Sequence, residues 1–309
     1  MIKRTVAILI SLLIPLACHA SEPLSVRPSE TDQRITEFDS PHLAWLPDGA
    51  ARNQLLVFLP GTGGKPEKKL FHPFARTAVA LGYHVVALMY PNNLASQKKC
   101  SQSDDPDAYL KFRNAIIRGG VIGPHRVVAP QDSIENRLEK LLVHLDAKQP
   151  GRGWGQFLAS GGAIEWRRVA VAGQSQGGGH SYMLGKNHEV ARVLMFGSPK
   201  DYSFHFDAPA KGFDANTKTP LKRFFAYNHM RDNGNGCTHA QQTKILRKMG
   251  LADLGIAEVD NPQSSYRHAH VLYTNADLGS STKFHASVLK QDLSANPSVW
   301  RYMLTEPVD

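Results

Sequence analysis

The chain has 309 residues, of which 42% are hydrophobic and 20% charged, so it holds enough apolar material for one large hydrophobic core or two modest ones. This composition excludes a chain that is disordered, collagen-like or coiled-coil throughout. The formal charge is +9, but Lys and Arg are scattered along the chain without interleaved aromatic residues, so we expect no nucleic-acid partner, and only a preference for acidic substrates or anionic surfaces stays open.

The N-terminal segment is predicted to be a secretory signal peptide. Lys3 and Arg4 precede an apolar run over residues 6–16, and the small-residue stretch Ala17–Ala20 follows. We expect cleavage after Ala20. The mature protein would then be residues 21–309, a single domain in the periplasm or outside the cell.

Two alternatives to cleavage after Ala20 stay open. A lipoprotein would keep Cys18 as its acylated N-terminus. A lipidation site has a leucine three positions before its cysteine, but this chain has Pro15 there. An uncleaved anchor would need a longer apolar run to span a bilayer, and no later segment resembles a spanning helix. We therefore expect no integral membrane segment after cleavage.

Two cysteines remain in the mature chain, Cys100 and Cys237, and both lie in polar surroundings. An exported chain meets an oxidising compartment, so we expect a disulfide between them. The alternative is a pair of free thiols.

The first half of the chain begins with a polar lead-in, residues 21–50, in which one edge strand is expected near Ile35–Phe38. A buried strand is then predicted over 54–59, a helix over 70–81 that ends before Gly82, and a second buried strand over 83–89. A long connection follows from Pro91 to Pro130 and contains a predicted helix over 108–118.

The same alternation continues to the C-terminus. Strands are predicted over 168–172, 190–196, 221–227 and 269–273, and helices over 131–147, 176–186, 240–249 and 284–293. Apolar strands that alternate with amphipathic helices predict an α/β fold, in which helices cover both faces of a mostly parallel sheet.

Two irregular connections, Pro91–Pro130 and Ser198–Pro220, are candidates for a lid over a binding cleft. The second contains four aromatic residues: Tyr202, Phe204, Phe206 and Phe213. The alternative interpretation is that these side chains only attach the loop to the body of the protein.

The sequence from Val169 to His180 contains a Gly-x-Ser-x-Gly motif, Gly173-Gln174-Ser175-Gln176-Gly177, directly between a predicted strand and a predicted helix. A nucleophilic serine needs this context, because a sharp turn lifts its hydroxyl above the edge of the sheet and leaves no room for side chains two residues away. The alternatives are an ordinary turn or a phosphate-binding loop, but no lysine follows as in a P-loop.

On these residues the chain resembles an α/β-hydrolase over about residues 50–300. The motif and the two glycines after it are similar to those of secreted bacterial esterases, lipases and cutinase-like polyester hydrolases, although Gln174 and Gln176 differ from the usual residues at those positions. The resemblance implies hydrolysis of acyl esters by a serine, an acid and a histidine, in that chain order.

The resemblance also implies an oxyanion hole. Its first donor is the backbone N–H of Gln176, and its second comes from the loop after the first buried strand, Pro60–Gly64, where the N–H of Thr62 has the expected position. The family's usual His-Gly motif is absent from this loop, and the alternative is a simple glycine-rich turn.

The implied acid follows a strand downstream of the motif, and Asp232 fits that position. Asp201, at the end of the preceding strand, is the competing candidate, and Asp232 has an alternative role as a turn residue. The implied histidine is His285. His268 and His270, whose spacing would put them on one face of a strand, are alternatives, and as a metal pair they lack a nearby third ligand.

The sequence therefore predicts a serine hydrolase of carboxylic esters, with no metal and no cofactor motif. A serine peptidase or amidase on the same fold and a non-catalytic binding protein are the other hypotheses. The ester, the oligomeric state and the final compartment stay open.

Overall fold

The structure is a computed structural model that describes residues 22–122, 126–234, 236–261, 266–279, 284–291 and 293–308. The predicted signal peptide and its cleavage site lie outside the described residues. No helix in these ranges is long and apolar enough to cross a bilayer.

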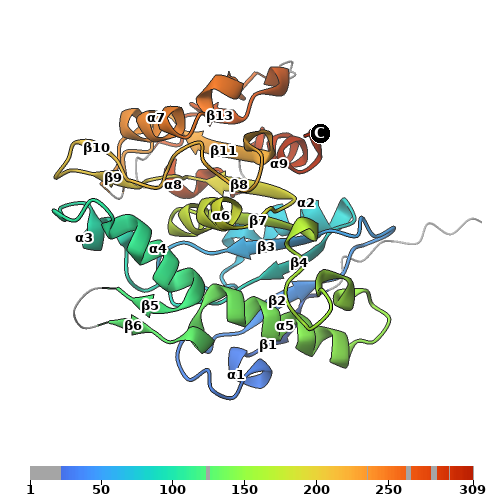
Figure 1. The fold of residues 1–309 in the computed structure, drawn as a ribbon. Coiled ribbons are helices and arrows are strands. Elements are labelled where there is room, and N and C mark those ends of the chain that lie inside the picture. The colour runs from blue at the N-terminus through green and yellow to red at the C-terminus, as the bar shows by residue number, and fades with distance from the viewer. Residues whose placement is uncertain are drawn as a thin grey trace, which may run out of the picture.

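The described residues form one central nine-stranded sheet (Figure 1). The first three strands in spatial order pair antiparallel, and every later pairing in this sheet is parallel. In spatial order the strands are β1 (Leu24–Val26), β2 (His42–Trp45), β4 (His84–Ala87), β3 (Leu55–Leu59), β7 (Val169–Gln174), β8 (Arg192–Phe196), β11 (Phe224–His229), β13 (Val271–Thr274) and β12 (Ile256–Glu258).

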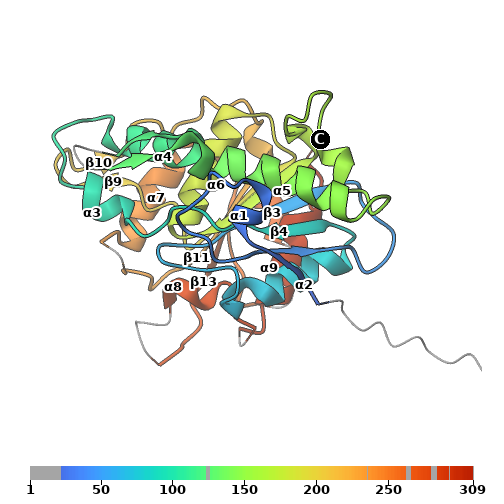
Figure 2. The same ribbon diagram turned by 90° about the horizontal axis from the view of Figure 1, so that it is seen from below.

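Helices cover both faces of the sheet (Figure 2). One layer holds α2 (His72–Ala80), α8 (Phe284–Ser287) and α9 (Asn296–Thr305). The other holds α4 (Ala108–Arg118), α5 (Ile134–Lys148), α6 (Gln176–Asn187) and α7 (His239–Lys248). This arrangement confirms the predicted fold class.

The central strand β3 shows why the fold needs two layers. Leu55, Val57 and Leu59 point to the layer of α5 and α6, whereas Leu56 and Phe58 point to the layer of α2 and α9. All five side chains are buried. When alternate side chains of a strand face two apolar layers, every residue of the strand is apolar. This is the pattern of β3 in the sequence.

The predicted edge strand at Ile35–Phe38 is wrong. Phe38 has a φ of 51°, which no strand contains, and the lead-in instead supplies the short strands β1 and β2. At the other end, the helix predicted over 284–293 ends at Ser287, and the sequence analysis missed α9 and the edge strand β12.

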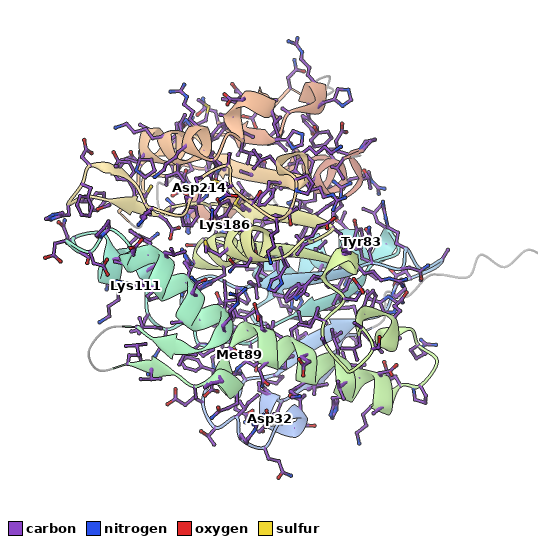
Figure 3. The ribbon with its side chains drawn as sticks, viewed as in Figure 1. Asp32, Tyr83, Met89, Lys111, Lys186 and Asp214 are labelled. Carbon is purple, nitrogen blue, oxygen red and sulfur yellow. The ribbon has the colours of Figure 1, made fainter. Side chains whose placement is uncertain are left out.

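The two long connections pack against the layer of α6. The first carries α3 (Ser96–Cys100), α4 and a hairpin of β5 (Gly120–Val121) and β6 (Val127–Val128). The second carries a hairpin of β9 (Tyr202–Ser203) and β10 (Ala208–Pro209), and its later part is fixed to α6 by an ion pair of 2.6 Å between Lys186 Nζ and Asp214 Oδ1 (Figure 3).

The four aromatic residues of the second connection differ in their burial. Tyr202 and Phe213 are buried, and the ring of Phe213 stacks on Tyr182 with centroids 4.6 Å apart. Phe204 and Phe206 are exposed. Two of the rings therefore attach the loop to the body, and two remain at the surface.

The predicted disulfide is absent from the structure, in which Cys100 and Cys237 are both free and buried. The Sγ of Cys237 donates a hydrogen bond to the carbonyl oxygen of Thr238 at 3.8 Å. Burial raises the pKa of each thiol to about 12, so both are held in the protonated form, which does not attack a disulfide. An oxidising compartment permits a disulfide but does not determine how the two side chains pack.

Candidate active site

Ser175 lies between the end of β7 and the first residue of α6, at the centre of the sheet. Its φ of 54° and ψ of −118° place it in a region that non-glycine residues rarely occupy. The Ser175 N–H donates to the carbonyl oxygen of Phe196 on β8 at 2.8 Å, which fixes the turn. A strained residue held by its surroundings is typical of a functional site.

The glycines of the motif are required by close backbone contacts around this turn. A Cβ atom added at Gly177 would lie 1.9 Å from the carbonyl oxygen of Leu59, and one at Gly173 would lie 2.3 Å from the carbonyl group of Gly177. A Cβ at Gly179 would lie 2.4 Å from Nη2 of Arg113. Glycines are needed at these positions because α6 packs closely against β7 and β3.

Asp232 and His285, which are far apart in the sequence, form a hydrogen bond. Nδ1 of His285 lies 2.7 Å from Oδ2 of Asp232. Asp232 follows β11, and His285 lies on α8, where it packs against Gly197: a Cβ at Gly197 would be 3.1 Å from the His285 Cε1 atom. The other ring nitrogen of His285, Nε2, is buried and has no hydrogen-bond partner among the described residues.

A cavity of about 650 Å³ opens above the motif. Ser175 and His285 both line it, together with Thr62, Gln174 and residues from α3 and the segment after β9. Ser175 and His285 thus line the same cavity, although they come from segments that are far apart in the sequence.

Asp232 is also bound by a buried lysine. Lys200 Nζ lies 3.1 Å from Asp232 Oδ2, the oxygen that also contacts His285, and both side chains are 1% exposed. The same ammonium group donates to the carbonyl oxygens of Gly234 at 2.9 Å and Cys237 at 3.1 Å. Lys200 therefore ties the carboxylate to the loop that carries it.

Two opposing effects act on the carboxyl group of Asp232. Burial raises its pKa, whereas the hydrogen bond with His285 and the charge and hydrogen bond of Lys200 lower it. The lowering effects together are larger, so the pKa of Asp232 lies below its ordinary value. Asp232 is consequently a carboxylate at neutral pH. The N–H of Gly234 donates to its other oxygen at 3.2 Å.

Asp201, the competing candidate for the acid, is engaged elsewhere. Its carboxylate is fully buried and accepts bonds from Arg113, with Nη2 at 2.9 Å from both oxygens and Nε at 3.0 Å from Oδ1. Arg113 also donates to the carbonyl oxygen of Gln176 at 2.6 Å. The structure thus brings Asp232 to His285 and gives Asp201 a place in the support of α6.

Of the two predicted oxyanion donors, Thr62 lines the cavity, and Gln176 directly follows Ser175 in the chain. The N–H of Gln176 belongs to the first turn of α6, where no intrahelical acceptor exists. Thr62 lines the cavity from a turn that is closed by a 2.9 Å bond from Gly64 N–H to the Gly61 carbonyl. The hydroxyl of Thr62 contacts Oε1 of Gln176 at 3.3 Å, so the two segments are in direct contact.

No protein-family model and no curated protein sequence matches the chain. Solved structures that resemble it include an alpha-beta serine hydrolase homologue from Coxiella burnetii, with 12% identity over 85% of this chain and 89% of that one and a TM-score of 0.43. Others are a dienelactone hydrolase from Anabaena variabilis, with 13% identity over 93% and 96% and a TM-score of 0.43, and a carboxylesterase from Mesorhizobium loti, with 16% identity over 88% and 98% and a TM-score of 0.39. Each of these three likenesses has an identity of 16% or less and a TM-score below 0.5.

The alternative histidines do not take part in the site. His268 is exposed and contacts Glu306, whereas His270 is buried and donates through Nδ1 to the carbonyl oxygen of Phe224 at 2.9 Å. Both precede β13, so the expected common face of a strand is wrong. Within the described ranges, no three His, Cys, Asp or Glu side chains come together as a metal-binding group.

Lys200 and Arg113 are the supporting residues that the sequence analysis missed. Each is a buried cation whose partner is far away in the sequence or lies in an irregular segment. Lys200 directly precedes Asp201, the residue singled out as a candidate acid, but no local pattern indicates that it is the lysine that reaches Asp232.

Proposed function

We propose that the protein is a serine hydrolase that cleaves carboxylic esters, with Ser175 as nucleophile, His285 as general base and Asp232 as the acid. The observation that carries the proposal is the 2.7 Å contact between His285 Nδ1 and Asp232 Oδ2. The Nε2 atom of this histidine has no partner among the described residues, and His285 lines the same cavity as Ser175. This geometry leaves Nε2 available to accept the serine proton.

In the first half of the reaction, His285 Nε2 takes the proton of the Ser175 hydroxyl while Oγ forms a bond to the ester carbonyl carbon. The Asp232 carboxylate holds the proton on Nδ1 and stabilises the imidazolium ring. The N–H groups of Gln176 and Thr62 donate to the oxyanion. The bond from carbon to the alcohol oxygen then breaks, and His285 returns its proton to the departing alcohol.

In the second half, water replaces the alcohol. His285 removes a proton from the water as its oxygen attacks the acyl-enzyme, the bond between Ser175 Oγ and the acyl carbon breaks, and Oγ recovers the proton. The products are one carboxylic acid and one alcohol for each ester and water consumed. No step needs a metal or a cofactor.

The decisive experiment compares wild type with Ser175→Ala on a panel of p-nitrophenyl esters and on peptide p-nitroanilides. We expect wild type to cleave the esters and Ser175→Ala to lose about 10³-fold or more in kcat, with the same circular dichroism and unfolding midpoint. Equal ester turnover by the variant would refute the proposal. Cleavage of the amides in preference to the esters would favour a peptidase or amidase instead.

We also propose that residues 1–20 act as a signal peptide and that the protein works in the periplasm or outside the cell. The support is the basic, apolar and small-residue order of that segment. Expression of the full chain in a Gram-negative host, followed by N-terminal sequencing, should give a mature chain that begins at Ser21. An intact N-terminus in the cytoplasmic fraction would contradict this.

A further inference from the structure

The cavity above Ser175 carries an unbalanced positive charge. Its described lining contains the ammonium side chain of Lys98, but no aspartate or glutamate. The remaining lining is polar or small: Thr62, Asn93, Ala95, Gln97, Ser101, Gln174 and Gly236, with the ring of Phe204 at one side. A negatively charged group in this cavity would therefore meet a cation and no carboxylate from the described lining.

Lys98 is free to bind a ligand. It is exposed, and its ammonium group makes no ion pair or hydrogen bond within the part of the chain that the structure describes. The cations closest to the catalytic groups are, by contrast, compensated: Lys200 is paired with Asp232 and Arg113 with Asp201. The excess charge on the cavity thus comes from Lys98 itself.

The short helix that carries Lys98 is fixed in place on both sides. At its start, the N–H of Ser96 donates to Oε1 of Gln176 at 3.0 Å, which links α3 to the residue after the nucleophile. Gln97 donates to the carbonyl oxygen of Lys200 at 3.3 Å. Just after its end, the carbonyl oxygen of Ser101 accepts from the N–H of Phe204 at 2.7 Å. The backbone of Lys98 therefore has a defined position relative to Ser175.

We propose that the substrates of this protein are esters that carry a carboxylate, and that Lys98 is the residue that selects them by binding that carboxylate. The inference rests on the proposed ester hydrolase function and adds its substrate class. An ion pair at an exposed site is weak in general, but no aspartate or glutamate of the described lining opposes this one. Lys98 acts on specificity and takes no part in the bond-breaking steps.

The test measures kcat/KM for matched charged and neutral esters. One pair places the charge in the acyl part: p-nitrophenyl hydrogen adipate against p-nitrophenyl hexanoate. The other pair places it in the alcohol part: 4-acetoxybenzoate against phenyl acetate. Each pair is assayed with wild type, Lys98→Met and Lys98→Glu. For each protein, kcat/KM for the charged ester is divided by kcat/KM for the neutral ester. Dividing this ratio in a variant by the ratio in wild type cancels the intrinsic reactivity of the esters.

Lys99→Glu is the matched control. Lys99 is next to Lys98 on the same helix, and its substitution by glutamate changes the net charge by the same amount. Lys99 lines a different cavity, together with Ala108 and Ile122. We expect Lys98→Glu to lower the charged-to-neutral ratio about tenfold in at least one pair, Lys98→Met to lower it severalfold, and Lys99→Glu to change it less than twofold. The Lys98 effect should grow as the ionic strength falls.

Each other result overturns the inference. If Lys98→Glu leaves both ratios within twofold of wild type while neutral esters are still hydrolysed, Lys98 does not select the substrate, and the ester hydrolase function stands alone. If Lys99→Glu changes the ratio as much as Lys98→Glu, only the general charge of the protein matters. If wild type cleaves neither member of either pair, the proposed function fails and the inference fails with it.

Discussion

Oδ2 of Asp232 contacts two nitrogen donors, and this makes Lys200 a positioning residue. His285 Nδ1 lies 2.7 Å and Lys200 Nζ 3.1 Å from the same oxygen, while Lys200 also binds two carbonyl oxygens of the loop after β11. Removing one partner of a buried ion pair leaves an uncompensated charge. The resulting loss in the free energy of unfolding is larger than the stability that the intact pair contributes.

Lys200→Met should therefore destabilise the protein by about 3 to 5 kcal/mol at pH 7. Because the pKa of Asp232 is lowered in the folded protein, the stability that this carboxylate contributes is present above pH 4 and is lost as the pH falls through its lowered value. Without Lys200 the pKa of Asp232 rises, so the cost of the substitution should shrink between pH 7 and pH 4 as the carboxyl group takes up a proton. Urea unfolding of both proteins across this range measures the effect.

Lys211→Met is the control for this prediction. Lys211 also pairs with an aspartate, Asp107, at 2.9 Å, but its side chain is 63% exposed. Its removal should cost less than about 1 kcal/mol, with little dependence on pH. An equally small cost for Lys200→Met, or one that does not change with pH, would show that the buried pair has no such role.

At the scale of elements, the junction of β7 and α6 determines where the nucleophile lies. The strand ends at Gln174, Ser175 makes the turn, and α6 begins at once, with Gly177 pressed against the end of β3. Because β3 lies next to β7 in the sheet, the carbonyl oxygen of Leu59 occupies the place that any side chain at position 177 would need.

Gly177→Ala tests how tightly the junction is packed. The added methyl group would lie 1.9 Å from a backbone oxygen, so the helix or the strand must move, and we expect a loss of about 3 kcal/mol or more in the free energy of unfolding. Gly49→Ala is the control, since a Cβ there meets no atom within 4 Å, and its effect should stay within about 1 kcal/mol. Similar unfolding midpoints for the two variants would contradict the description of the junction.

The sequence predicts the buried elements better than the edges. The strands β3, β4 and β7 are largely apolar because helices cover both their faces, and such runs are visible without an alignment. The edge strands β1 and β12 have three residues each and are only partly buried, so their sequences carry little signal. The helix α9 was missed, although Val299, Trp300 and Met303 bury an apolar face against the core.

For the whole molecule, the candidate site depends on bringing together segments that the sequence separates. Ser175 is indicated by a local motif, but Asp232 and His285 follow only from the order of strands along the chain and from the implied family, and the structure joins them by a hydrogen bond. Lys98 and Lys200 had no local signal, because the residues around them come from segments that are far apart in the sequence.

The most direct test of the proposed roles of Ser175, His285 and Asp232 is covalent labelling of the native protein with a fluorophosphonate, followed by peptide mapping. A serine reacts with this probe only when a neighbouring base activates it. We predict a single adduct on Ser175 in wild type, labelling slowed roughly a hundredfold or more in His285→Ala and in Asp232→Asn, and none in protein unfolded in urea. An unlabelled Ser175 in the native protein, or labelling of Ser175 at an unchanged rate in His285→Ala, would contradict the proposed roles of Ser175 and His285.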